Sequence, residues 1–382
     1  MAAPDWSRLR EEFPTMGQWT YLDTARKALP PRCQQQAMQE YWQDIEDTAG
    51  AAAWSAAAVS DTRVAMAELL GAKPGEIAFT KNTTDGLTIA AHAFDLRPGD
   101  NIVLTDLEHT ANLWVWQHWA QKGVEIRKAK NRGGRLPVEA FIEQMDARTR
   151  VVSTAYITYG TGYRVDVPAL AEACRARGVR LVLDGVQAAG VIAAPLASLG
   201  ADLIAIGGHK NLFGLTGLGL LYCREELVDE LCTPWLKAPV AAGSAKASAH
   251  LNSQFDYVRT AHRFEGGNPN FLGLHVLRRS AAFLQSIGIR EIEARVQHLT
   301  TLLIDKVSAA GFEVKTSRPW AERAQIVSVA VPDAGSLMDR LRERHRVVVN
   351  VKDGAMRLSL GFANSEADID RAVAAIREET GA

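Results

Sequence analysis

Short apolar runs rich in β-branched residues alternate with longer helical patterns through the first two-thirds of the chain, and this alternation limits the possible folds. The candidate strands lie at 77–80, 101–105, 124–127, 151–155, 181–184, 203–206 and 217–222. Helical patterns separate most of them, such as 167–177, which ends at Gly178. Alternation of this kind predicts βαβ units. We therefore expect an α/β fold with a seven-stranded, mainly parallel sheet covered by helices on both faces.

The last third of the chain has a different pattern. A segment of small residues at 238–248 is expected to form a mobile loop. Beyond Gly273 come a long helical pattern, candidate strands at 325–331 and 346–351, and a closing helix at 368–379. The chain has 382 residues, more than a single hydrophobic core usually serves. We predict a large domain at 16–255 and a smaller α+β domain made of 1–15 and 256–382.

Charge and cysteine usage argue against several classes of protein. The net charge is −1, so no global field favours nucleic acid or an anionic membrane surface. The four cysteines show neither CxxC spacing nor the spacing of zinc ligands, which predicts reduced thiols and no metal site. Neither a signal peptide nor an apolar stretch long enough to span a membrane is evident. We expect a cytoplasmic protein with a small-molecule substrate.

Asp184 and Lys210 each follow an apolar candidate strand, and ligands of parallel sheets bind beyond the carboxyl ends of the strands. A buried carboxylate needs a positive partner, which a protonated pyridine nitrogen provides. A desolvated lysine amine has a lowered pKa, as formation of a Schiff base requires. Alone, Asp184 could cap a helix that starts at Val186, and Lys210 could be a surface residue. Together they predict pyridoxal 5′-phosphate (PLP) as the cofactor.

Three further positions suit such a cofactor. Thr83 and Thr84 lie between a candidate strand and a helical pattern, where unpaired N–H groups and the helix dipole favour a phosphate. A plain capped helix is the alternative, and Asp85 would repel an anion there. His109 follows another strand and could stack on an aromatic ring. The alternative interpretation of His109 is a helix cap or a core position.

Two arginines are candidate substrate ligands. Arg357 lies on a short apolar strand, where a guanidinium needs a planar anion such as a substrate carboxylate. A structural salt bridge is an equal alternative. Arg26, with Trp54, Trp114 and Trp116, could line an aromatic and basic entrance suited to a bulky or acidic side chain. For the tryptophans, a core or interface position is the alternative.

Taken in order, these motifs resemble the class V aminotransferase family, which includes cysteine desulfurases, selenocysteine lyases, kynureninases and isopenicillin N epimerases. The resemblance runs from 21–25 to 364–370. It rests on Thr83-Thr84, Glu108-His109, Asp184-Gly-Val-Gln187, Gly208-His-Lys210, Arg263-Phe-Glu-Gly-Gly-Asn268 and Arg357-Leu-Ser359.

The resemblance implies a fold-type-I homodimer with shared active sites. Lys210 would form the Schiff base, Asp184 would pair with the ring nitrogen, Gln187 would contact the ring oxygen and His109 would stack on the ring. Thr83, Thr84 and His209 would hold the phosphate, Asn268 would reach the phosphate of the neighbouring subunit, and Arg357 would bind the substrate carboxylate.

The sequence departs from the family pattern at four places. Gly207 replaces a phosphate-binding serine, Asn268 a threonine, and Tyr159 an asparagine often found near the ring oxygen. Tyr159 could donate to that oxygen or shape the substrate pocket. The loop 347–356 also lacks the sulfur-accepting cysteine of desulfurases. Persulfide transfer is therefore not expected.

We expect a PLP enzyme that acts on an α-amino acid through a carbanion at Cα. Lys210 would be the general base, and Asp184 would stabilise the charge that develops. Aminotransferase-type chemistry is the first choice, with a Cβ–S or Cβ–Cγ lyase or an epimerase as alternatives. A cofactor-binding regulator without turnover is the contrasting class, and it would not need Lys210 and Arg357 together.

Overall fold

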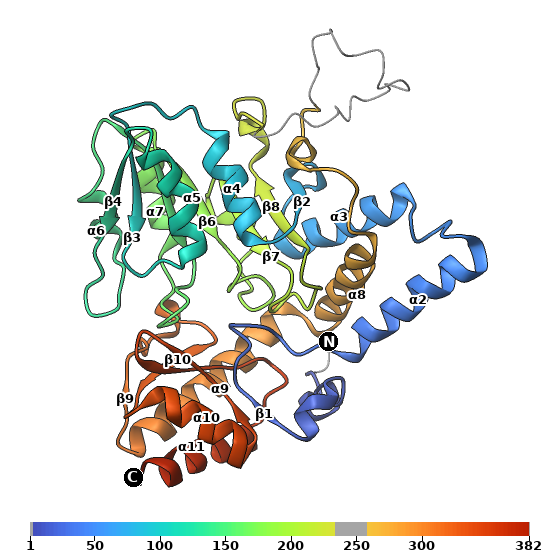
Figure 1. The fold of residues 1–382 in the computed structure, drawn as a ribbon, viewed down its shortest axis with the longest axis vertical. Coiled ribbons are helices and arrows are strands. Elements are labelled where there is room, and N and C mark those ends of the chain that lie inside the picture. Colours follow the sequence, from blue (N-terminus) through green and yellow to red (C-terminus); the bar gives the residue numbers. More distant parts are fainter. Residues whose placement is uncertain (1–2, 234–257, 382) are drawn as a thin grey trace.

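A seven-stranded sheet forms the centre of the larger part of the molecule. The computed structural model describes residues 3–233 and 258–381 (Figure 1). The strand order is β2-β8-β7-β6-β5-β3-β4. The bounds are β2 (Ile77–Thr80), β3 (Asn101–Thr105), β4 (Glu125–Ala129), β5 (Thr149–Ala155), β6 (Arg180–Asp184), β7 (Leu203–Gly207) and β8 (Gly219–Cys223). Only β8 runs against its neighbours. The predicted mainly parallel sheet is confirmed.

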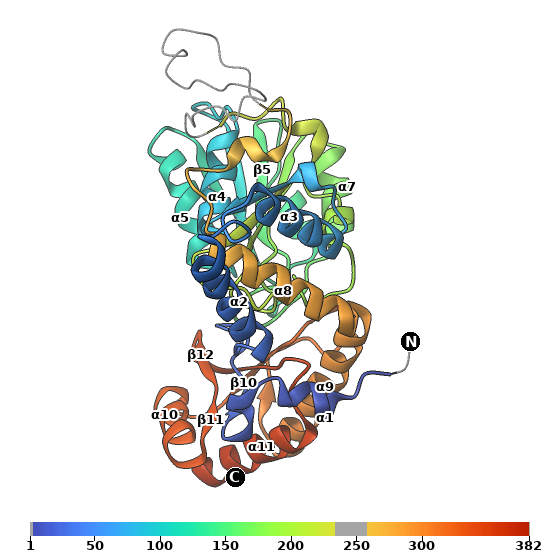
Figure 2. The same ribbon diagram turned by 90° about the vertical axis from the view of Figure 1, so that its right-hand side faces the viewer.

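Helices cover both faces of this sheet. On one side lie α4 (Thr83–Ala93) and α5 (Thr110–Ala120). On the other lie α3 (Ala56–Leu70), α6 (Val138–Ile142), α7 (Val167–Arg175) and α8 (Phe271–Ile287), and Figure 2 shows the sheet between α4 and α7. Successive strand residues point to opposite faces, so Val182 packs under α4 while Leu181 and Leu183 pack on the other side. Burial on both faces explains why these strands read as continuous apolar runs.

A smaller antiparallel sheet lies in the C-terminal part (Figure 1). Its order is β12-β13-β10-β9, with β9 (Glu313–Val314), β10 (Ile326–Ala330), β12 (Asn350–Lys352) and β13 (Ala355–Ser359). The helices α9 (Ile289–Ala309), α10 (Ala334–His345) and α11 (Glu366–Thr380) share a core with it. The expected α+β character of this part is confirmed.

Two predicted elements are divided in the structure. The strand expected at 346–351 is β11 (Val347–Val348) followed by β12, because the chain leaves a pairing with β1 (Thr20–Tyr21) and joins β13. The long helical pattern after Gly273 is α8 and α9, separated by Gly288 at a φ of +95°. Most residues avoid that conformation and glycine does not, so the helix ends there.

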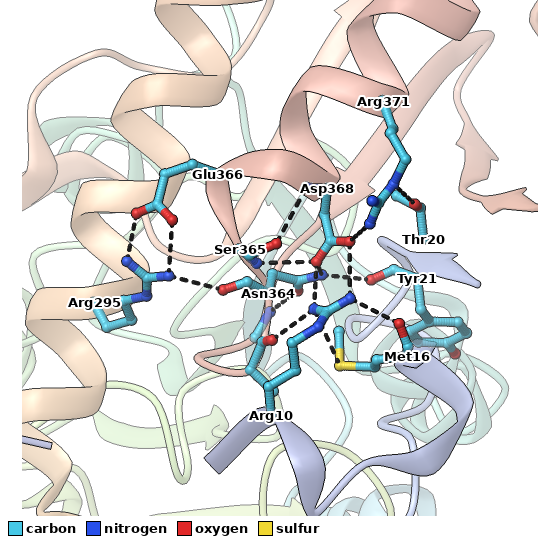
Figure 3. Close-up of polar contacts among 12 residues, drawn as sticks. Arg10, Met16, Thr20, Tyr21, Arg295, Asn364, Ser365, Glu366, Asp368 and Arg371 are labelled. Atoms are coloured by element: carbon cyan, nitrogen blue, oxygen red, sulfur yellow. Dashed lines mark hydrogen bonds and ion pairs between the residues drawn. The ribbon is translucent and has the colours of Figure 1, made fainter. Parts of the chain in front are cut away.

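The N-terminal residues are fixed to the C-terminal helix by a polar cluster (Figure 3). The Asp368 carboxylate is fully buried and accepts hydrogen bonds from Arg10 at 2.5 and 3.0 Å and from Arg371 at 2.5 Å. The Asn364 amide donates to the Tyr21 carbonyl at 3.0 Å. A buried carboxylate needs such partners, so the cluster holds the chain before and within β1 against α11.

The predicted domain division at 16–255 stays a prediction, and its second boundary lies outside the described residues. Two observations bear on it. β1 pairs with β11 of the C-terminal part, and α8 packs against α3 and α2 (Arg32–Thr48) of the N-terminal half. The segment 238–248, expected to be a loop, also lies outside the described residues. Within the described residues, no helix combines the length and apolar character needed to cross a membrane.

Candidate active site

A cavity of about 250 Å³ opens beyond the carboxyl ends of β5, β6 and β7. Asp184 closes β6, while His209 and Lys210 follow β7. Apart from the three tryptophans considered for the entrance, every site residue predicted from the sequence lines this cavity except Asn268, which is exposed elsewhere. The residues brought together are Arg26, Thr83, Thr84, His109, Tyr159, Asp184, Gln187, His209, Lys210 and Arg357.

Asp184 and Lys210 influence each other electrostatically inside the cavity. Burial raises the pKa of Asp184, while the Lys210 charge and a 2.9 Å hydrogen bond from the Val186 N–H lower it. Burial lowers the pKa of Lys210 to about 8, although the Asp184 carboxylate acts in the opposite direction. Asp184 therefore lines the cavity and also accepts a hydrogen bond from the turn at Val186, where the helix considered as an alternative does not form. A partly neutral amine beside a carboxylate is the arrangement expected for a Schiff-base lysine.

The lowered pKa of Lys210 gives a testable pH dependence. Only the neutral amine attacks a carbonyl, so covalent attachment of PLP to the apoprotein should accelerate about tenfold per pH unit on the acidic side. Because the pKa is about 8, the rate should level off above that pH. Stopped-flow absorption of apoprotein mixed with PLP measures it. A rate that keeps rising to pH 10 would mean that the amine has the pKa of an exposed lysine.

The expected phosphate end of the cavity lies at the start of α4. Asn82 caps the helix through a 2.9 Å hydrogen bond from the Asp85 N–H, and the Asp85 carboxylate accepts from the Lys81 N–H at 2.9 Å. Asn82, Thr83 and Thr84 line the cavity, whereas Asp85 does not. The Asp85 carboxylate, which was expected to repel an anion, is thus outside the cavity. The N–H groups at the start of the helix remain available to an anion.

The structure also explains the glycine at position 207. A Cβ atom there would lie 2.8 Å from Thr83 Oγ1 and 3.2 Å from the His209 ring. Thr83 and His209 therefore occupy the space that a serine side chain would need. Burial lowers the pKa of His209 to about 4, so it faces the cavity as a neutral imidazole.

Gly207→Ser should therefore weaken PLP binding, although it restores a hydroxyl. The new side chain displaces Thr83 Oγ1, and losing one hydrogen bond to a charged group should weaken binding about tenfold. Spectroscopic titration of apoprotein with PLP measures the change. Gly335→Ser is the matched control, because nothing lies within 4 Å of the Cβ position there. Tighter binding by Gly207→Ser would contradict this account.

His109 is both a helix cap and a cavity residue. Its Nδ1 accepts a hydrogen bond from the Ala111 N–H at 3.1 Å, which places the proton of the neutral ring on Nε2. The ring meets Tyr159 edge to face, with 5.1 Å between centroids. Burial lowers its pKa, and Lys210 adds to the effect. The Tyr159 hydroxyl donates to Asp353 at 3.4 Å.

Arg357 is buried and already has protein partners. Its Nη2 donates to Asp23 at 3.1 Å and its Nη1 to the Tyr159 carbonyl at 2.9 Å. Asn350 donates to the other Asp23 oxygen at 2.9 Å. A guanidinium has five N–H groups, and Arg357 Nε has no partner in the described structure. Arg357 therefore forms the structural salt bridge and also lines the cavity.

Gln187 is more constrained than expected. Its Nε2 donates to the Ala25 carbonyl at 2.9 Å, and its Oε1 accepts from Gln325 at 3.2 Å. One amide N–H remains for a ligand in the cavity. The tryptophans expected at the entrance lie elsewhere: Trp116 is fully buried in the core, while Trp54 and Trp114 are 50% and 71% exposed.

Besides Asn82, three polar residues of this region were not predicted as site residues. Asp23 pairs with Arg357, and Lys352 lines the cavity from the end of β12. Glu108, the buried neighbour of His109 in the sequence, accepts a hydrogen bond from the Ala155 N–H at 3.0 Å. Burial, with the Asp184 charge, raises the pKa of Glu108 to about 8. The Glu108-His109 pair was visible in the sequence, but no pattern marked its carboxyl as buried.

Comparison with known proteins identifies the family. The model of the family described as Aminotransferase class-V matches residues 20–372. The chain belongs to the class V aminotransferase family. A cysteine desulfurase of Cronobacter sakazakii is 27% identical over 97% of each chain. The uncharacterized aminotransferase YcbU of Bacillus subtilis is 26% identical, also over 97% of each.

A solved structure confirms the fold. The apo structure of cysteine desulfurase from Thermococcus onnurineus NA1 superposes with a TM-score of 0.87 at 24% identity, covering 100% of this chain and 99% of that one. The fold is that of the fold-type-I enzymes. PLP is the cofactor of this class V enzyme. The cavity fits it, since it holds an amine, a buried carboxylate that needs a cation, and a helix start.

Proposed function

We propose that this chain is an aminotransferase-type enzyme for an α-amino acid. The observation that carries the proposal is that Lys210, Asp184 and Arg357 line one cavity. These side chains come from β6, from the loop after β7 and from β13, which are far apart in sequence. A base, a carboxylate for a cationic ring and a guanidinium for a carboxylate are the three groups that this chemistry needs.

Each residue has a distinct role in the proposal. Bound PLP supplies an electron sink for negative charge at the substrate Cα. Lys210 Nζ takes the proton from Cα and returns one, and its pKa of about 8 suits both steps near neutral pH. Asp184 keeps the ring nitrogen protonated through an ion pair. Thr83, Thr84 and His209 would bind the phosphate, and His109, which meets Tyr159 edge to face, would stack on the ring.

Arg357 would bind the substrate α-carboxylate with the N–H groups that Asp23 and Tyr159 leave free. Asp23 holds the guanidinium and is itself held by Asn350, so little side-chain freedom is lost on binding. Because Asp23 already balances the Arg357 charge, other cations must contribute to the attraction of an anionic substrate.

A Cβ–S lyase is the second candidate, and the relative named cysteine desulfurase favours it. Transfer of sulfur to a cysteine of this chain has less support. Cys33, Cys174 and Cys223 are buried, Cys232 is exposed, and none of them lines the cavity. A lyase here would release sulfur without a protein persulfide at the cavity.

We also propose that the enzyme is a homodimer. Asn268 is exposed and outside the cavity of its own chain, as a residue that serves a neighbouring active site would be. Trp114 and Trp54 add exposed apolar surface of the kind that interfaces cover.

Absorption spectroscopy of the holoenzyme with single L-amino acids tests the function. An aminotransferase should convert the bound cofactor to pyridoxamine 5′-phosphate with one equivalent of keto acid, and a second keto acid should restore the original band. Repeated release of keto acid with the original band retained would replace the proposal by the lyase. A spectrum that no amino acid changes would overturn both.

A further inference from the structure

A second cavity of about 560 Å³ adjoins the candidate active site. The two share Arg26 and Lys352 in their walls. The second cavity is also lined by Arg342 and Asp339 of α10 and by residues 348–350. Together the shared wall and the outer cavity present three basic side chains and one carboxylate. We call this outer space the side cavity.

The basic groups of the shared wall are not used by the protein itself. Among the described residues, neither Arg26 nor Lys352 forms an ion pair. Arg342 lies over the Trp19 ring, 5.3 Å from its centroid. Arg357, by contrast, is neutralised by Asp23. The uncompensated positive charge on the substrate side therefore lies at the junction of the two cavities.

Arg26 and Lys352 lie near opposite ends of the sequence, and backbone contacts bring them to the same place. The Arg26 N–H donates to the Asp23 carbonyl at 3.1 Å, and the preceding Ala25 N–H donates to Ser359 Oγ at 2.9 Å. Lys352 closes β12 and is paired with Ala355 of β13. The backbones of both residues are thus anchored to the strand that carries Arg357, so their side chains start from fixed points near the carboxylate-binding guanidinium.

We propose that Arg26 and Lys352 bind a second acidic group, so that the substrate is an amino acid with an anionic side chain. The inference rests on the proposed function and specifies its substrate class. Arg357 holds the α-carboxylate, and the side chain of the substrate extends towards the side cavity. A second carboxylate there meets two unpaired cations, whereas a neutral side chain of the same size leaves both unpaired.

Spectral titration of the holoenzyme tests this directly. L-aspartate is compared with L-asparagine, and L-glutamate with L-glutamine, because each pair has the same shape and differs in charge. We expect the apparent Kd of at least one acid to be about tenfold lower than that of its amide, as two favourable charge pairs at a partly exposed site together allow. Added salt should reduce this preference.

The titration can contradict the substrate class or the proposed function, and the two results differ. Equal or tighter binding of both amides overturns the substrate class but leaves the proposed function in place. No spectral change with the two acids and two amides, together with a change produced by another L-amino acid, also overturns the substrate class alone, whereas no change with any L-amino acid overturns the proposed function itself.

Single substitutions test whether Arg26 and Lys352 cause the preference for the acid over its amide. Arg26→Gln and Lys352→Gln should each lower the acid-to-amide preference about threefold, because the two cations share the roughly tenfold preference. Lys27→Gln is the matched control, since Lys27 is a neighbouring exposed cation that lines neither cavity. If Arg26→Gln weakens acid and amide by the same factor, Arg26 binds the α-carboxylate and the proposal is overturned. The salt dependence of the unsubstituted enzyme provides the test should a variant not fold.

Discussion

Lys210→Ala is expected to lower turnover of any amino acid by at least about 10⁴-fold, the upper range for loss of a general base. The loss should be larger than that figure suggests, because the same amine also captures the cofactor. Lys352 is the other lysine of the cavity, but it lies at the outer wall that adjoins the side cavity. It comes from β12, whereas Lys210 follows β7 next to Asp184.

The variant should still bind PLP without a covalent bond. Thr83, Thr84, His209 and Asp184 remain, and they account for the phosphate and ring contacts in the proposal. Borohydride reduction followed by peptide mass analysis should attach the cofactor to the peptide with Lys210 in the parent enzyme and to none in the variant. Lys128→Ala, on exposed edge strand β4, serves as the control for handling. Full activity of Lys210→Ala would end the PLP assignment of this residue.

The large sheet was predictable because its strands are buried on both faces. Residues of β6 illustrate this: Leu181, Val182 and Leu183 are all buried, although they point alternately to the two sides. Such strands appear in a sequence as short continuous apolar runs. The polar groups at their ends were predictable for the same reason, since Asp184 is costly at the end of an apolar run unless it has a partner.

Pairings between distant segments were not predictable. The strand expected at 346–351 divides at Val349, because Val347 and Val348 pair with Thr20 and Tyr21 near the N-terminus. Arg357 and Asp23 are separated by 334 residues, and no local pattern links them. The sequence therefore indicated that Arg357 needs an anion but left open whether the anion belongs to the protein or to the substrate.

Glu108 shows a different limit. Its neighbour His109 drew attention because an imidazole can stack on a ring, whereas a glutamate in a polar loop suggests a solvated surface. Its burial arises only when the loop before α5 packs against β5, where the Ala155 N–H and the nearby Asp184 charge act on it. The raised pKa of about 8 means that Glu108 is largely protonated at neutral pH in the apoprotein.

Asp184→Asn is the second substitution with a large expected effect, and we expect kcat/KM to fall about 10³-fold, as for removal of a preorganised electrostatic group. The amide oxygen can still accept the hydrogen bond from the Val186 N–H, so the turn after β6 should be preserved. Burial opposes the charge of Asp184, so removing that charge should not destabilise the apoprotein.

This combination separates a catalytic effect from a structural one. Asp184→Asn should keep or raise the melting temperature of the apoprotein while lowering both turnover and PLP affinity, because a protonated ring nitrogen loses its ionic partner. A pH titration adds a further check. The charge of Asp184 helps to raise the pKa of Glu108, so Glu108 should titrate at a lower pH in the variant. Suppose that Asp184→Asn retained turnover while Lys210→Ala lost it. Protonation of the ring nitrogen would then not depend on this carboxylate, and the charge-stabilising role would belong to another group of the cavity.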